Sequence, residues 1–169
     1  MFVDEKLLLQ KAEAYAVRHR LQLADRLGLG MHGIVFVAES KERVFKSAVK
    51  IFQNEEPYQK ERNAYVRLKE HGVENIRGFH VPQLLSFDDD LLVVEVTIVT
   101  RPYLLDFAGA FLDRPPEFPE EVLTDWHEQK VEQFGERWAI VELVLAELRS
   151  HGIFFTDVNP DNVRFLDSG

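Results

Sequence analysis

The spacing of apolar residues changes near residue 100, and this change predicts two differently built parts of the chain. Before residue 100, short β-branched and aromatic runs alternate with glycine-containing or acidic turns, which is typical of antiparallel strands. The predicted strands span residues 21–27, 34–38, 44–52, 84–87 and 91–99. Amphipathic spacing predicts helices over residues 4–20 and 55–71. This part is therefore expected to be a small five-stranded antiparallel sheet with one helix, preceded by an N-terminal helix.

Beyond a linker at residues 100–102, the apolar spacing becomes helical. The predicted helices span residues 104–112, 120–134 and 136–150. Pro119 favours the start of the second of these helices, and Gly152 favours the end of the third. The fold class is expected to be α+β, divided into residues 1–20, 21–99 and 100–169.

Composition and charge narrow the classes of protein that fit. The 169 residues are 46% hydrophobic and 11% aromatic, which is enough for one packed domain or two small lobes that share a cleft. The net charge of −9 argues against a nucleic-acid-binding protein, although it is compatible with a local basic pocket. The chain has no cysteine, which excludes disulfides, thiolate nucleophiles and thiolate metal sites. The N-terminal residues lack the features of a signal peptide and no run is long enough to span a membrane, so a cytoplasmic location is expected.

The last stretch of the chain carries the first candidate chemistry. Asp157 ends an apolar run, Pro160 favours a turn, and Asn162 precedes a short strand predicted over residues 163–166. This spacing can place two oxygen donors over one small volume, which suits a base beside a substrate hydroxyl and a ligand of a magnesium ion. The alternative is that Asp157 and Asn159 simply hydrogen-bond the backbone of the turn.

Three glycines, a lysine and a glutamate form a second group of candidates. Gly28, Gly30 and Gly33 lie between two predicted strands, which excludes a dinucleotide-binding fold, because that fold requires a helix directly after its glycines. Lys50 stands among apolar neighbours on the third predicted strand, and Glu61 lies on the inner side of the helix that follows. The simpler alternatives are a plain hairpin turn, a surface lysine and a solvated glutamate.

In this order along the chain, the candidate residues resemble those of a protein kinase. The glycine-rich kinase pattern G-x-G-x-x-G-x-V is matched by Gly28, Gly30, Gly33 and Val35. Residues 48–50, A-V-K, are similar to the strand-three lysine motif V-A-I-K. Residues 157–162, D-V-N-P-D-N, are similar to the catalytic-loop pattern D-x-x-x-x-N. The resemblance covers about residues 21–166, and its specificity lies in the order of the motifs.

The resemblance implies a two-lobe fold in reduced form, with a five-stranded N-lobe, a hinge near residues 99–102 and a truncated helical C-lobe. It also implies that the cofactors are ATP and Mg²⁺. Backbone N–H groups of the three glycines would approach the phosphates, Lys50 would contact the α- and β-phosphates, and Glu61 would hold Lys50 in place. Val35 and Ala48 would cover the adenine, whose edge would meet the backbone of residues 95–99.

The resemblance also assigns the catalytic groups. Asp157 would orient the acceptor hydroxyl, and Asn162 would bind magnesium. The expected catalytic residues are therefore Asp157, Lys50 and Asn162.

Three departures from the kinase pattern change what is expected of the activity. Phe155 and Thr156 stand where protein kinases typically carry His and Arg, and Asn159 stands where many carry a lysine near the transferred phosphate. Asp167 begins an Asp-Ser-Gly sequence, but it follows Asn162 by only five residues, which fits the turn of a hairpin rather than the magnesium motif D-F-G. The chain is therefore expected to stop before the magnesium aspartate, although Asn162 and Asp167 could still help to hold one ion.

Three functions are compatible with these features. The first is an ATP-binding, protein-kinase-like enzyme that transfers the γ-phosphate to a Ser or Thr hydroxyl of a protein. The second is a pseudokinase that acts as a binding or regulatory module, and the third is a small-molecule phosphotransferase of the kinase-like superfamily. A shorter C-lobe would also uncover apolar surface, so a protein partner or a second copy of the chain is expected on one face. The aromatic residues of that face are Trp126, Phe134, Trp138 and Phe154.

Overall fold

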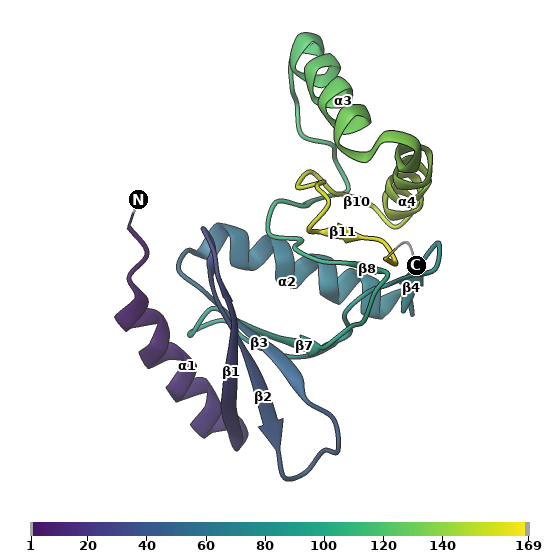
Figure 1. Ribbon diagram of the computed structural model, residues 1–169. Helices are drawn as coiled ribbons and strands as arrows, with labels where there is room; N and C mark the ends of the chain where they lie inside the picture. Colours follow the sequence, from purple (N-terminus) through teal and green to yellow (C-terminus); the bar gives the residue numbers. More distant parts are fainter. Residues whose placement is uncertain (1, 168–169) are drawn as a thin grey trace.

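The computed structural model describes residues 2–167, and its largest sheet is the antiparallel, five-stranded sheet that the sequence predicts (Figure 1). In spatial order its strands are β1 (Leu21–Leu29), β2 (Gly33–Ser40), β3 (Ser47–Phe52), β7 (Val93–Thr97) and β6 (Leu84–Asp88). The prediction of an α+β fold is confirmed. The third strand begins at Ser47 rather than at residue 44, because Val44 lies fully exposed in the preceding turn.

Alternation along the central strands separates the two faces of this sheet. Val35 pairs with Lys50, and Lys50 pairs with Val94, so these three side chains project from one face. Their neighbours Val49 and Ile51 project from the opposite face, where both are completely buried. The side chain of Lys50, which has apolar neighbours on β3, therefore lies on the face of the sheet that is turned toward the rest of the chain.

The two helices of this part cover opposite faces of the sheet, and both predicted helices are confirmed. Helix α1 (Glu5–His19) packs beside β1, β2 and β3, where Leu8, Ala12 and Tyr15 are buried (Figure 1). Helix α2 (Glu55–Glu70) contacts β3, β6 and β7 from the other side. Its buried residues recur at helical spacing and are Tyr58, Glu61, Ala64, Tyr65 and Leu68.

A buried polar cluster fixes α1 to the sheet. The carboxylate of Glu95 on β7 is only 2% exposed and accepts hydrogen bonds from three side chains. The Tyr15 hydroxyl donates over 2.8 Å, the Ser47 hydroxyl over 2.7 Å, and Arg43 Nη2 over 2.6 Å. Because three side chains donate to this carboxylate, its buried negative charge is compensated. The cluster also fixes the position of α1 on the sheet, because Tyr15 belongs to that helix.

Two smaller sheets combine residues 75–80, which precede β6, with segments that follow β7. Strands β4 (Asn75–Ile76), β5 (Phe79–His80), β8 (Tyr103–Leu104) and β11 (Val163–Arg164) form a four-stranded sheet in the order β11-β8-β5-β4. Strands β9 (Phe111–Leu112) and β10 (Ile153–Phe154) form an antiparallel pair. The predicted strand at residues 163–166 is therefore present but shorter.

The helix predicted over residues 104–112 is wrong. This segment contains β8 and β9, joined by a turn in which the Ala110 N–H donates to the Phe107 carbonyl over 2.9 Å. Asp106 has a φ of 65°, which breaks any helix at that point. Apolar runs of this length fit either a buried helix or buried strands, and the strand partners that decide the matter come from residues 153–164, far along the chain.

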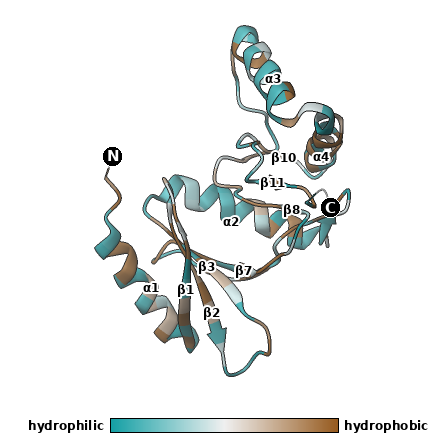
Figure 2. Cartoon of the chain, in the orientation of Figure 1, coloured by the Kyte–Doolittle hydropathy of each residue, from teal (hydrophilic) through white to brown (hydrophobic). Residues whose placement is uncertain are grey.

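The remaining helices are α3 (Glu120–Phe134) and α4 (Trp138–Ser150), separated by the single 3₁₀ turn η1 (Gly135–Arg137). Figure 2 shows mainly apolar residues along α4 and a mixed pattern along α3. These two predicted helices are confirmed, except that α4 begins two residues later than expected, after the 3₁₀ turn.

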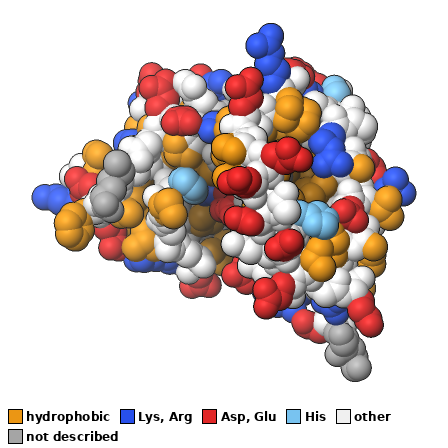
Figure 3. Space-filling model, turned by 90° about the horizontal axis from the view of Figure 1, so that it is seen from above, with side chains coloured by type: hydrophobic (Ala, Val, Ile, Leu, Met, Phe, Trp, Pro, Cys, Tyr) orange, Lys and Arg blue, Asp and Glu red, His pale blue; other side chains and the backbone are white. Residues whose placement is uncertain are grey.

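Acidic side chains are spread over much of the face that Figure 3 shows. Within residues 2–167, no helix is both long and apolar enough to cross a membrane.

The aromatic face that was expected to be uncovered is only partly so. Phe134 and Trp138 are buried, with 8% and 7% exposure, and Trp126 packs edge-on against Trp138. Trp138 is covered because α3 folds back on α4, and Phe134, the last residue of α3, packs into the core. Trp126 and Phe154 do line an apolar cavity of about 430 Å³. The expected partner stays a prediction.

Candidate functional site

A cavity of about 450 Å³ lies on the α2 side of the large sheet, within the usual size range of small-molecule sites. Strands β1, β2, β3 and β7 supply one largely apolar wall, α2 supplies a second, and the segment from Thr97 to Asp106 supplies a third. Six residues singled out from the sequence line it: Gly28, Val35, Ala48, Lys50, Glu61 and Asn162. Four others are not among its lining residues: Gly30, Gly33, Asp157 and Asp167.

An ion pair between β3 and α2 lies in the wall of the cavity. Lys50 Nζ donates to Glu61 Oε2 over 2.7 Å, and the two side chains are 17% and 4% exposed. Strand alternation brings Lys50 to this face, and the buried stripe of α2 brings Glu61 opposite it. The Tyr65 hydroxyl, one turn further along α2, also interacts with the Glu61 carboxylate.

Burial and charge act together on the ionisation of these groups. Burial lowers the pKa of Lys50, but the carboxylates of Glu61 and Asp106 outweigh it, so the pKa lies above its ordinary value and the amine stays protonated. Burial raises the pKa of Glu61, against the opposing effect of the Lys50 ammonium. Burial and the Glu61 charge raise the pKa of Tyr65 well above its usual range, so this hydroxyl is a neutral donor.

Asp106 is the residue that sequence reasoning missed. Its Oδ1 lies 3.5 Å from Lys50 Nζ, and its side chain is 29% exposed in the cavity wall. The backbone is held there because the Leu105 N–H donates to the Asn162 carbonyl over 2.9 Å. The signal in the sequence was an acid inside the apolar run Leu104 to Ala110, where a helix was predicted instead.

The loop at residues 157–162 is tied together by its own side chains. Asn159 Oδ1 accepts the N–H groups of Asp161 and Asn162 over 2.9 and 3.1 Å, so the turn-forming alternative describes Asn159. Asn162 Nδ2 donates to the Asp157 carbonyl over 3.0 Å. The Asp157 carboxylate is exposed and accepts from Asn159 Nδ2 over 3.1 Å. Asn162 thus belongs to the cavity, while Asp157 lies on the surface beside it.

The glycines of the β1–β2 hairpin have different structural roles. The Gly30 N–H donates to the Gly33 carbonyl over 2.9 Å and closes the turn. A Cβ added to Gly33 would lie 1.8 Å from the Ile51 carbonyl oxygen, so the close approach of β2 to β3 requires glycine there. A Cβ on Gly28 would meet no atom within 4 Å, and Gly28 alone of the three lines the cavity.

Asp167, the other metal ligand expected from the sequence, is engaged elsewhere. Its carboxylate forms an ion pair with Arg101, and its side chain is 84% exposed. It therefore does not join Asn162 at the cavity. Within residues 2–167, no group of three or more His, Cys, Asp or Glu side chains is arranged to hold a metal ion.

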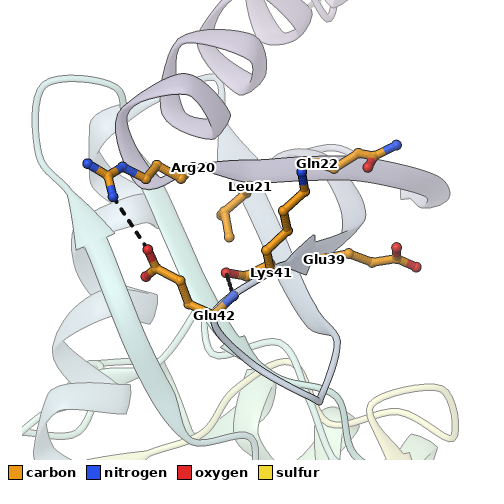
Figure 4. Close-up of a pocket in the computed structure, with 7 residues that line it drawn as sticks. Arg20, Leu21, Gln22, Glu39, Lys41 and Glu42 are labelled. Carbon is orange, nitrogen blue, oxygen red and sulfur yellow. Dashed lines mark hydrogen bonds and ion pairs between the residues drawn. The ribbon is translucent and has the colours of Figure 1, made fainter.

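A second polar cavity, of about 480 Å³, lies where β1 begins and β2 ends (Figure 4). Among its charged side chains, Arg20 Nη1 lies 3.5 Å from Glu42 Oε1, whereas Glu39 pairs with Lys46 outside the lining. Because these side chains are mostly exposed, the arrangement is a surface ion pair and not a set of groups that converge on an enclosed volume. The cavity beside Lys50 is therefore the stronger candidate.

Comparison with known proteins gives no relative: no protein-family model, no curated protein and no solved structure matches this chain.

Proposed function

We propose that this chain adopts a reduced, two-lobe protein-kinase-like fold and binds ATP in the cavity beside Lys50. The observation that carries the proposal is the buried Lys50–Glu61 ion pair at the wall of a largely apolar cavity. An ammonium held by a carboxylate is a fixed cation, and a fixed cation beside apolar walls suits a ligand that has both a flat ring and phosphates.

The lining residues divide the proposed site into a ring end and a phosphate end. The adenine packs against Val35 and Ala48, and its edge meets the backbone just beyond β7. The Thr97 N–H already donates to the Gln83 carbonyl over 2.9 Å, so the edge contacts come from Ile98 and Val99. The phosphates then extend along the cavity toward the Lys50 ammonium.

The test is a calorimetric titration of ATP into the wild type and the Lys50→Met variant, with Lys46→Met as the matched control. Lys46 is an exposed lysine directly before the same strand, paired with Glu39 over 2.9 Å. Loss of a charge-assisted phosphate contact weakens binding by about tenfold or more in Lys50→Met. The control binds within about twofold of the wild type. Equal affinity in all three proteins would show that Lys50 does not contact the nucleotide.

The bound nucleotide can serve phosphoryl transfer or binding alone. Transfer is supported by Asn162 at the cavity and by the adjacent Asp157 carboxylate, which an acceptor hydroxyl can reach from the surface. Binding alone, as in a pseudokinase, is supported by the asparagine at position 159, where a lysine would stabilise the transferred phosphate.

A transfer assay with labelled ATP separates these functions. We expect Asp157→Asn to keep ATP affinity within about twofold and to lose at least about a hundredfold in transfer rate, since general bases contribute this much. Asp161→Asn is the control, because Asp161 is an exposed acid of the same loop that pairs with Arg164. Wild-type transfer to hydroxyl-bearing small molecules but not to proteins would favour a small-molecule phosphotransferase. No transfer to either class would favour the pseudokinase.

A further inference from the structure

The charges around the cavity do not suit a bare nucleotide. Among the lining residues in the described part of the chain, Lys50 is the only cation, whereas Glu61 and Asp106 are both acids. When ionised, these three side chains leave a net charge of −1. A triphosphate is itself strongly anionic, and in a partly buried site its repulsion from the second carboxylate is only weakly screened. A further positive charge would therefore strengthen the binding of the phosphates.

Asp106 is not the main partner of the lysine. Lys50 Nζ bonds Glu61 at 2.7 Å, whereas its 3.5 Å distance to Asp106 Oδ1 is an ion pair without a good hydrogen bond. The other contact of Asp106 is local, from the Ala108 N–H to Oδ1 over 3.3 Å. Glu61 alone can therefore hold Lys50 in place, so the negative charge of Asp106 is available for another interaction.

The fold brings Asp106 and Asn162 to the same cavity from two paired strands. Leu104 on β8 pairs with Val163 on β11, and the next residue, Leu105, hydrogen-bonds the backbone of Asn162. Both Asp106 and Asn162 line the cavity, and Asp106 Oδ1 lies 3.5 Å from Lys50 Nζ. The side-chain amide nitrogen of Asn162 donates to the Asp157 carbonyl. The amide oxygen of Asn162 is therefore available to bind a cation.

We propose that Asp106 binds the divalent cation that accompanies the nucleotide, with the Asn162 amide oxygen as the second protein ligand. Magnesium is usually held by one or two carboxylates together with substrate phosphates, rather than by a cage of protein side chains alone. This inference rests on the proposed nucleotide site.

The experiment measures ATP affinity by calorimetry with and without Mg²⁺ in the wild type and in Asp106→Asn, which keeps the shape and removes the charge. In the wild type, Mg²⁺ tightens ATP binding by about tenfold or more. In Asp106→Asn this gain falls to about twofold or less, while metal-free ATP binds as well as or better than to the wild type, because one repulsive charge is gone. A purely structural role for Asp106 would instead weaken binding under both conditions.

Two further variants and a second readout complete the test. Asp106→Glu restores most of the Mg²⁺ gain, and Asp167→Asn, which changes an exposed acid outside the cavity, keeps all of it. With Mn²⁺ in place of Mg²⁺, the paramagnetic signal of the preformed Mn²⁺–ATP complex changes when wild-type protein is added, and this change is much smaller with Asp106→Asn. If the wild type binds ATP equally with and without Mg²⁺, or if Asp106→Asn keeps the gain, the metal role is overturned and the nucleotide site stands. If no ATP binds under either condition, both proposals fail.

Discussion

Removal of the Lys50 ammonium should destabilise the fold, because it leaves the Glu61 carboxylate buried without its partner. In Lys50→Met the length of the side chain is kept, but Glu61, which is 4% exposed, loses its 2.7 Å contact. Breaking a buried pair on one side costs about 3–5 kcal/mol, and we expect about 3 kcal/mol because Lys50 retains some solvent contact. In a chain of this length, that corresponds to a decrease in melting temperature of about 6–12 °C.

The pH dependence of this loss identifies its cause. Burial already raises the pKa of Glu61 above 4.5, and without the ammonium the pKa rises further. An acid whose pKa is higher in the folded state binds its proton more tightly there. The stability it provides is therefore full below its unfolded pKa and is lost as the pH rises through its folded pKa. The free-energy difference between wild type and Lys50→Met should thus grow from pH 5 to pH 8, with a slope of up to about 1.4 kcal/mol per pH unit.

Urea denaturation at several pH values, followed by tryptophan fluorescence and circular dichroism, measures this difference. The double variant Lys50→Met/Glu61→Gln is the matched control, because it has no buried charge to ionise and should show a small, pH-independent difference from the wild type. If Lys50→Met loses less than about 1 kcal/mol, or if its loss is the same at pH 5 and pH 8, then Glu61 is not the buried, charge-dependent partner described above.

Two other substitutions test how the sheet is assembled. Gly33→Ala should cost about 2 kcal/mol or more, because its Cβ would meet the Ile51 carbonyl oxygen at 1.8 Å, whereas Gly30→Ala should stay within about 0.5 kcal/mol. Equal urea midpoints for these two variants would contradict the close approach of β2 to β3. Tyr15→Phe removes one of three donors to the buried Glu95 and should cost about 1.5 kcal/mol by calorimetric unfolding. An unchanged melting temperature would mean that the remaining donors compensate fully.

Local patterning accounts for the parts of the site that lie on regular elements. Period-two alternation places Val35, Ala48 and Lys50 on one face of the sheet, independently of tertiary contacts. Helical spacing places Glu61 on the buried side of α2. The sequence could therefore predict the sheet and the two helices beside it, whereas the pairing of Lys50 with Glu61 was expected from the resemblance to protein kinases. The roles of these residues in binding stay predictions.

Contacts between distant segments decide the rest. Nothing local distinguishes a buried helix from buried strands at residues 104–112, so the sequence alone could not predict that β8 pairs with β11 or that Asp106 meets Lys50. The same holds for Trp138, which is hidden because α3 folds back over α4. The sequence by itself determined which face each strand and helix buries, since that depends on residue spacing within one element. Only the tertiary structure decided that Asp106 shares the cavity with Lys50, because that depends on hydrogen bonds between segments that are far apart in the chain.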